Sequence, residues 1–160
     1  MMIQSHRLEF CSFQTQLMTS GLSSDGLLVS KSLLPGAGLG LFAARDFVEG
    51  ETICRYQSPH GTMTTREAVQ LEDKSFLMRL GPQTYVDLKH VPEVKARYIN
   101  DCRQVDRHNV RFLKRPDEGY ADVVAMRDIQ CGEELYVDYG RFYWFGSKTL
   151  PSKLAVMNEG

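Results

Sequence analysis

The sequence predicts a mainly β domain, of the β-rich α+β class, built from small sheets and a few short helices. Short runs of apolar and β-branched residues recur along most of the 160-residue chain, separated by glycine, proline and aspartate. Only two segments have the pattern of a short helix, and strands and helices do not alternate as they do in parallel α/β folds. Because a chain of this length can bury one sizeable core, we expect one domain.

The first half of the chain contains three strand candidates and one helix. The strands are predicted at residues 27–30, 41–44 and 52–56, with a glycine-rich turn at residues 35–40 between the first two. A helix is expected at residues 64–71, because Thr64 and Glu67 have the spacing of a capping box. We divide the chain into an N-terminal lead-in segment, a main domain, and an aromatic C-terminal segment with a tail, at residues 1–26, 27–140 and 141–160.

The second half begins with a predicted hairpin. Its strands lie at residues 76–80 and 84–87, on either side of the typical turn sequence Gly81-Pro82-Gln83. Pro92 is expected to begin a second short helix that runs to Ala96, because proline is favoured in a first helical turn. Three further strands are predicted at residues 109–113, 120–126 and 135–137.

Composition excludes some classes of partner. The 19 Lys and Arg residues are balanced by 20 Asp and Glu, so the overall charge predicts neither direct nucleic-acid readout nor membrane-surface binding. No apolar run approaches the ~20 residues of a membrane span. The four cysteines are dispersed and have no metal-ligand spacing with the histidines, so we predict no bound metal and reduced thiols in an intracellular protein. The oligomeric state is left open.

Two groups of polar or glycine residues are candidates for ligand contact. Gly36, Gly38 and Gly40 are not a dinucleotide-binding fingerprint, because the residues after them predict a strand and not a helix. They form either a simple tight turn or a backbone that approaches a ligand without Cβ interference. Asn100 and Asp101 directly follow an apolar pair, and they either cap a turn or face a ligand.

The order of these motifs resembles that of the SET-domain protein lysine methyltransferases. The turn Gly38-Leu39-Gly40-Leu41-Phe42-Ala43 is similar to the family's first motif. The stretch from Arg97 to Asn109 resembles its Arg-Phe-Ile-Asn-His-Ser-Cys-x-Pro-Asn motif, and Gly132 to Tyr139 resembles Gly-Glu-Glu-Leu-Thr-x-Asp-Tyr. The resemblance covers about residues 27–140. It implies a SET-type fold of small antiparallel sheets, with a C-terminal pseudoknot in which the second and third motifs pack together.

The resemblance also implies an activity and a site. The implied activity is methylation of a protein lysine, often on a histone tail, with S-adenosylmethionine as cofactor. Tyr139 matches the catalytic tyrosine. The cofactor would meet Gly38, Leu39, Gly40, Arg97, Asn100 and Asp101. Tyr85, Phe112 and Val137 are placed along the channel that admits the lysine. Trp144 is a candidate to stack on the cofactor or close the channel, and the alternative for both Phe112 and Trp144 is core packing.

Two departures from the family pattern leave a second interpretation open. Asp101 stands where the family usually has histidine, and the loop from Asn100 to Asn109 is three residues longer and lacks the proline. We expect Asp101 to pair with Arg97 or Arg103, and the hydrogen bond of the missing imidazole to be lost. The alternatives to an enzyme are an inactive SET-like module that binds a peptide or the cofactor, and a plain interaction domain. A histone substrate would imply the nucleus, and another substrate the cytoplasm.

Overall fold

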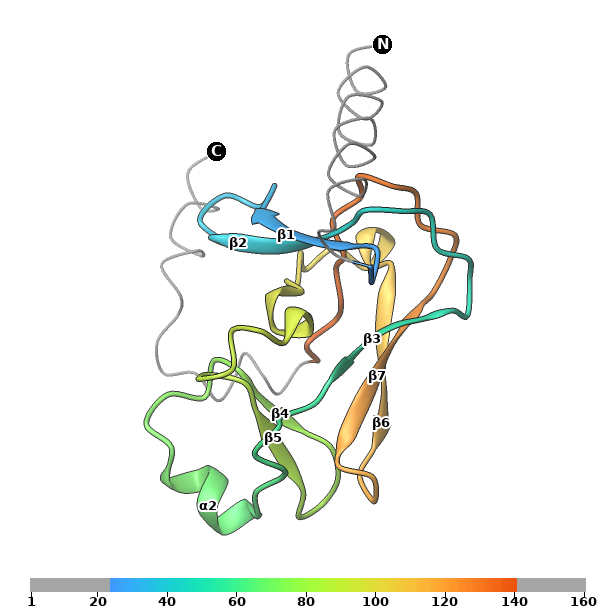
Figure 1. Ribbon diagram of the computed structural model, residues 1–160. Coiled ribbons are helices and arrows are strands. Elements are labelled where there is room, and N and C mark those ends of the chain that lie inside the picture. The colour runs from blue at the N-terminus through green and yellow to red at the C-terminus, as the bar shows by residue number, and fades with distance from the viewer. Residues whose placement is uncertain (1–23, 141–160) are drawn as a thin grey trace.

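Three small antiparallel sheets make up most of the computed structural model, which describes residues 24–140. They are β1 (Leu27–Lys31) with β2 (Leu39–Ala43), β4 (Leu77–Arg79) with β5 (Tyr85–Asp87), and a three-stranded sheet of β3 (Thr52–Tyr56), β7 (Tyr120–Ala125) and β6 (Val110–Arg115) in that order. Figure 1 shows the sheets around a central region through which the last described segment passes. The predicted mainly β class is confirmed.

The first hairpin follows from its glycines. Gly36 and Gly38 have φ angles of 71° and 74°, a region that side chains with a Cβ rarely adopt, and they turn the chain between β1 and β2. The strand after the turn starts at Leu39, earlier than predicted, because Gly40 already pairs with Ser30 across the hairpin. All of the first motif except Gly38 therefore belongs to the strand.

The helix predicted after the capping box is present as α2 (Thr65–Gln70). The Thr64 N–H donates to Glu67 Oε2 at 2.7 Å, and the Glu67 N–H donates to Thr64 Oγ1 at 3.4 Å. The side chain of each residue thus accepts a hydrogen bond from the backbone N–H of the other, as the capping box requires. Figure 1 places this helix at the far end of the molecule from the β1–β2 hairpin.

The second predicted helix is shorter and tighter than expected. The chain after Val91 makes successive three-residue turns, with the Val94 N–H bonded to the Val91 carbonyl at 3.2 Å. It becomes a regular 3₁₀ helix only at η1 (Lys95–Tyr98), so the predicted start at Pro92 is wrong. A second 3₁₀ turn, η2 (Val105–Arg107), lies in the lengthened loop and was not predicted.

The last predicted strand does not form a ladder. Its N–H groups bond to different partners: Leu135 to the Leu41 carbonyl at 2.7 Å and Val137 to the Asn100 carbonyl at 3.0 Å. The carbonyl of Tyr136, the residue between these two, accepts the Asn109 N–H at 3.0 Å. The segment is not a strand, because each of its residues forms hydrogen bonds with a different part of the chain. The second and third motifs therefore lie side by side, as the resemblance implies, and Figure 1 shows the segment running through the molecule's centre.

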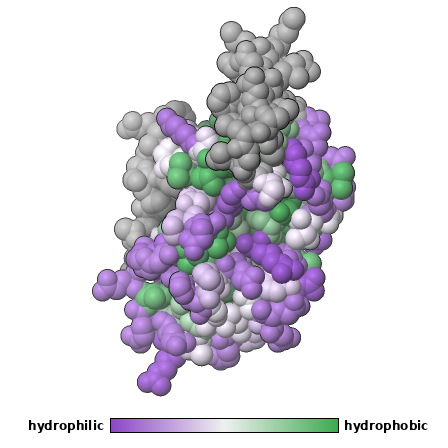
Figure 2. All heavy atoms as spheres, viewed as in Figure 1, coloured by the Kyte–Doolittle hydropathy of each residue, from purple (hydrophilic) through white to green (hydrophobic). Residues whose placement is uncertain are grey.

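The core lies where the sheets and this segment meet. Leu41, Val86, Leu88 and Leu135 are fully buried. On the face seen in Figure 2, polar and charged side chains predominate and apolar ones occur in small separate groups. No helix in the described part of the chain is long and apolar enough to cross a membrane. Within residues 24–140, no three His, Cys, Asp or Glu residues gather as a metal site.

The cysteines behave differently from one another. Cys54 and Cys102 are free thiols, and burial raises the pKa of the Cys54 thiol to about 12. Cys54 is therefore uncharged and unreactive at neutral pH, because the thiolate is the nucleophile. Cys131 is disulfide-bonded, so the expectation that all cysteines are reduced is wrong for this residue.

Asn109 connects the second and third motifs through its side chain. It is only 1% exposed, its amide nitrogen donates to the Glu134 carbonyl at 2.9 Å, and its amide oxygen accepts the Tyr136 N–H at 2.8 Å. Both partners are buried backbone groups. The side chain replaces the regular sheet pairing that this segment lacks.

We predict that Asn109→Ala lowers the free energy of unfolding by about 2–4 kcal/mol, because it leaves two buried backbone groups unpaired and a small cavity. Urea unfolding followed by circular dichroism measures the change. Gln83→Ala is the control, since Gln83 is an exposed amide in a hairpin turn, and it should shift stability by less than about 0.5 kcal/mol. Equal effects of the two substitutions would contradict the structural role of Asn109.

Candidate active site

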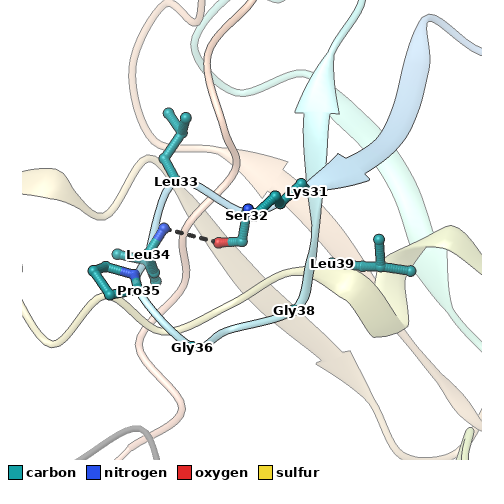
Figure 3. A pocket seen from close by; sticks show the side chains of 8 residues that line it. All are labelled: Lys31, Ser32, Leu33, Leu34, Pro35, Gly36, Gly38 and Leu39. Carbon is teal, nitrogen blue, oxygen red and sulfur yellow. Dashed lines mark hydrogen bonds between the residues drawn. The ribbon is translucent and has the colours of Figure 1, made fainter. Parts of the chain in front are cut away.

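The loop between β1 and β2, which contains the glycine turn, lines an open hollow of about 740 Å³ by itself, through residues 31–36, 38 and 39. This volume is in the range of small-molecule sites. Figure 3 shows the loop curling back on itself, with the Leu34 N–H bonded to Ser32 Oγ at 3.1 Å. Leu33 and Leu39 are 68% and 50% exposed here, so the hollow presents apolar surface next to backbone polar groups.

The two motif glycines are required for different reasons. A Cβ on Gly38 would meet nothing within 4 Å, so only its positive φ favours glycine there. A Cβ on Gly40 would overlap the Glu134 carboxylate. Glycine at position 40 thus lets a buried carboxylate reach the turn, while the space beside Gly38 is open.

Glu134 holds the turn in place. The carboxylate is 3% exposed and accepts hydrogen bonds from Ser32 Oγ at 2.6 Å and the Leu33 N–H at 2.7 Å, both at the start of the loop. It also accepts from Asn100 Nδ2 at 3.3 Å and the Tyr136 hydroxyl at 2.8 Å. A buried carboxylate is tolerated only when its oxygens are satisfied in this way.

Tyr136 joins this carboxylate to the lengthened loop. Burial, followed by the hydrogen bond to Glu134, raises the pKa of the Tyr136 hydroxyl well above its usual value, so it stays protonated and donates. The Arg107 guanidinium lies over the Tyr136 ring, 5.0 Å from its centroid, and Nη2 donates to the hydroxyl oxygen at 3.4 Å. The loop that is longer than the family motif is therefore tied to the glycine turn.

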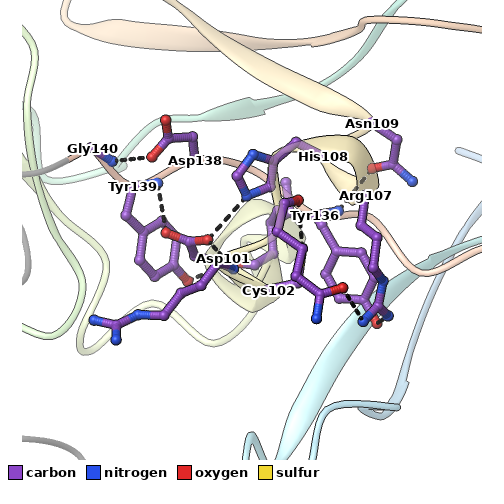
Figure 4. Close-up of polar contacts among 12 residues, drawn as sticks. Asp101, Cys102, Arg107, His108, Asn109, Tyr136, Asp138, Tyr139 and Gly140 are labelled. Carbon is purple, nitrogen blue, oxygen red and sulfur yellow. Dashed lines mark hydrogen bonds and ion pairs between the residues drawn. The ribbon is translucent and has the colours of Figure 1, made fainter. Parts of the chain in front are cut away.

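Two adjacent residues connect the glycine turn with Tyr139. Asn100 Nδ2 donates to the Leu39 carbonyl at 2.9 Å, and Asp101 Oδ2 accepts the Tyr139 N–H at 3.1 Å. The Tyr139 hydroxyl donates to the Ile99 carbonyl at 2.6 Å. Figure 4 shows Asp101 between Tyr139 and His108. The two motifs, a hundred residues apart in sequence, thus meet at Asn100 and Asp101.

Of the two arginines expected to pair with Asp101, Arg103 contacts it through its backbone and Arg97 does not, and His108 is a partner that was not expected. Asp101 Oδ1 lies 3.1 Å from His108 Nε2, and the same oxygen accepts the backbone N–H of Arg103 at 2.7 Å. Arg97 is directed elsewhere: its guanidinium lies 4.2 Å from the centroid of the Phe76 ring and Nη2 donates to a backbone carbonyl. His108, from the other end of the loop, thus places an imidazole beside position 101.

The residues predicted for the lysine channel lie on three different segments. Val137 is 2% exposed and belongs to the core. The Phe112 ring packs edge-to-face on the Tyr56 ring, with centroids 5.7 Å apart. Tyr85 begins β5 and pairs with Met63 through its backbone. Trp144 falls outside the described residues.

Sequence reasoning missed three residues of this site: Ser32, Glu134 and His108. Glu134 was quoted only as part of a motif, and Ser32 lies 102 residues from it, so no local pattern connects them. The histidines, His108 among them, have no metal-ligand spacing with the cysteines, and that spacing is the only signal for them in the sequence analysis. The place of His108 directly before Asn109, where the lengthened loop ends, is the available signal that it lies near Asp101.

Comparison with known families covers most of this site, from Gly38 onwards. The sequence model of the SET domain matches residues 38–140, which contain the glycine turn, the Asn100 segment and Tyr139. The chain belongs to the SET domain family. The SET-type fold implied by the motifs is thereby confirmed, and its small antiparallel sheets are those of the structure.

Lysine methyltransferases are among the relatives of this SET domain. It is 29% identical over 133 residues to N-lysine methyltransferase KMT5A-A of Danio rerio, covering 78% of this chain and 38% of the relative. It is 30% identical over 149 residues to histone-lysine N-methyltransferase EZH2 of Chaetomium thermophilum, covering 86% of this chain and 9% of that protein. The chain thus spans well under half the length of these relatives. Its membership of the lysine methyltransferase family rests on the domain alone.

We predict that Gly40→Ala disrupts the site of this SET domain more than Gly38→Ala. The first substitution forces the Glu134 carboxylate out of its buried position, and we expect a loss of about 2–4 kcal/mol in unfolding free energy. The second only strains a positive φ, at about 1 kcal/mol. Urea unfolding of both variants gives the comparison. A larger loss for Gly38→Ala would show that the contact with Glu134 is not what requires glycine.

Proposed function

We propose that this SET domain is an active protein lysine N-methyltransferase that uses S-adenosylmethionine, carried by residues 27–140. The observation that supports this best is the convergence of the two motifs: Asn100 bonds the glycine turn and Asp101 bonds Tyr139. These contacts support a single site that includes both motifs. The names of the relatives support a protein lysine as substrate, and a histone tail is the candidate we propose.

The residues present fit the cofactor. Gly38 leaves open space beside the turn, and the hollow there has a suitable volume and apolar walls. We assign Gly38, Leu39, Gly40 and Asn100 to this side of the site, whereas the Asp101 carboxylate is engaged by Tyr139, His108 and the Arg103 N–H. The assignment of Arg97 rests on the family motif, because its guanidinium is stacked on aromatic rings. Trp144 is retained as a candidate for the outer wall.

For methyl transfer, the main task of the protein is to align the methyl donor with the lysine amine. When bound, S-adenosylmethionine would supply a methyl group on a positively charged sulfur: the neutral lysine amine would attack the methyl carbon in line, and the bond from carbon to sulfur would break to leave a neutral thioether. The free lysine amine has a pKa near 10.4, so the channel must favour its uncharged form, and burial among apolar side chains beside a positive charge does so. We propose Tyr85, Phe112 and Val137 as parts of that channel. Exclusion of water and fixed approach geometry supply most of the rate.

Tyr139 is the proposed catalytic residue. Its hydroxyl hydrogen is directed to the Ile99 carbonyl at 2.6 Å, so the phenolic oxygen meets the reacting groups as a hydrogen-bond acceptor. An acceptor in this place can orient the lysine amine and stabilise the partial positive charge on the transferred methyl. This requires no ionisation of the phenol.

The alternative is an inactive module that binds a peptide or the cofactor without turnover. Its motivation was the loss of the motif histidine at position 101. The imidazole of His108 beside Asp101 removes much of that motivation, and we favour the enzyme. We propose an intracellular location, nuclear if the substrate is a histone.

We predict that Tyr139→Phe lowers kcat at least 100-fold, because the transition state loses its oriented acceptor, while the Kd for S-adenosylmethionine changes less than about threefold. Transfer of labelled methyl to core histones or lysate proteins measures kcat, and calorimetry measures the Kd. Tyr98→Phe is the matched control, since it also removes a tyrosine hydroxyl that donates to a backbone carbonyl. It should keep at least half the activity. Cofactor binding without any methyl transfer by the unmodified protein would favour the inactive module.

A further inference from the structure

Asp101 and His108 form a buried pair beside the proposed catalytic tyrosine. Their side chains are only 4% and 7% exposed, and His108 Nε2 lies 3.1 Å from Asp101 Oδ1. The other carboxylate oxygen, Oδ2, accepts the backbone N–H of Tyr139 at 3.1 Å. Figure 4 shows the chain of contacts from the imidazole through the carboxylate to the tyrosine.

The conformation of the lengthened loop brings Asp101 and His108 together. Arg103 adopts a left-handed conformation with φ of 56°, which is unfavourable for a residue with a Cβ, and its N–H donates to Asp101 Oδ1 at 2.7 Å. The η2 turn then follows, and the Arg107 N–H bonds to the Gln104 carbonyl at 3.0 Å. The loop thereby brings the chain back so that His108 lies beside Asp101. The hydrogen bond from the Arg103 N–H to the Asp101 carboxylate offsets the strain of the left-handed conformation at Arg103.

Tyr139 is held at both ends by the residues around Asp101. Its hydroxyl donates to the Ile99 carbonyl and its N–H to the Asp101 carboxylate. A carboxylate can accept on both oxygens at once, whereas a neutral amide has one acceptor. His108 in turn restricts the rotation of the Asp101 carboxylate by bonding to the oxygen that Tyr139 does not use.

We propose that Asp101 and His108 are a positioning pair that orients Tyr139 for methyl transfer, which rests on the function proposed above. Neither residue touches the reacting atoms in this role. Their removal therefore affects kcat more than the Kd for the cofactor, whereas a direct cofactor contact of Asp101 would weaken cofactor binding first.

The first test uses Asp101→Asn, His108→Leu and His108→Gln in the full chain. Asp101→Asn keeps the size of the side chain but loses one acceptor, and we expect kcat to fall 10- to 100-fold with the cofactor Kd within threefold. His108→Leu should lower kcat by a similar factor. His108→Gln retains an N–H donor within reach of Asp101 and should recover kcat to within about fivefold of the unmodified protein. A drop in cofactor affinity that accounts for the whole loss, or no rescue by glutamine, would overturn the proposal.

The second test does not depend on activity. Amide hydrogen exchange of Tyr139, followed by NMR of tyrosine-labelled protein, reports the hydrogen bond to Asp101 directly. Asp101→Asn and His108→Leu should each speed exchange at Tyr139 at least tenfold, and His108→Gln should not. The Tyr136 amide is the internal control, because it donates to the Asn109 side chain and not to Asp101.

The two tests separate failure of this proposal from failure of the proposed function. If the unmodified protein binds the cofactor but transfers no methyl group, the proposed function fails, while faster exchange at Tyr139 in both variants still supports the positioning contact. If the protein is active and Asp101→Asn leaves kcat and Tyr139 exchange unchanged, the positioning pair is refuted and the enzyme stands. Faster exchange with unchanged kcat also refutes it, since the contact would then have no part in the reaction.

Discussion

The buried Glu134 carboxylate is the constraint on which the site depends. Its four hydrogen-bond donors come from three places in the chain: Ser32 and Leu33 in the first loop, Asn100 after η1, and Tyr136 in the last segment. All four are neutral groups. A carboxylate removed from water is destabilising unless such donors surround it, so the segments that supply them are held together as a set.

This arrangement explains the departures from the family motif in physical terms. The Asn100 side chain serves the glycine turn and Glu134, so its neighbour Asp101 points towards Tyr139. An aspartate in that position brings a carboxylate into a buried place, and it needs donors as much as Glu134 does. His108 and the Arg103 N–H provide them. The lengthened loop and the replaced histidine are thus one coupled change, because each makes the other tolerable.

The fold was predictable where its causes are local. The capping box of α2 depends on two side chains three residues apart, and the β6–β7 hairpin on a turn at Gly119, whose φ is 80°. The site was predictable only through the order of its motifs. The contact between Ser32 and Glu134 joins residues 102 positions apart, and no periodicity encodes such a pair. The last segment was misjudged for the same reason: its sequence favours a strand, but its partners change with each residue.

That changing set of partners has a consequence for how the protein folds. The carbonyl and N–H groups of residues 134–137 bond to β2, to Asn100 and to the start of β6, so they find their places only after all three are assembled. Contacts between distant parts of a chain form late, since each closes a long loop. The three local hairpins and turns can form early, but the contacts of Glu134 with the first loop and the position of Tyr139 arise together at the end. Only completely folded chains would therefore bind a ligand at this site, because partly folded chains would lack the site.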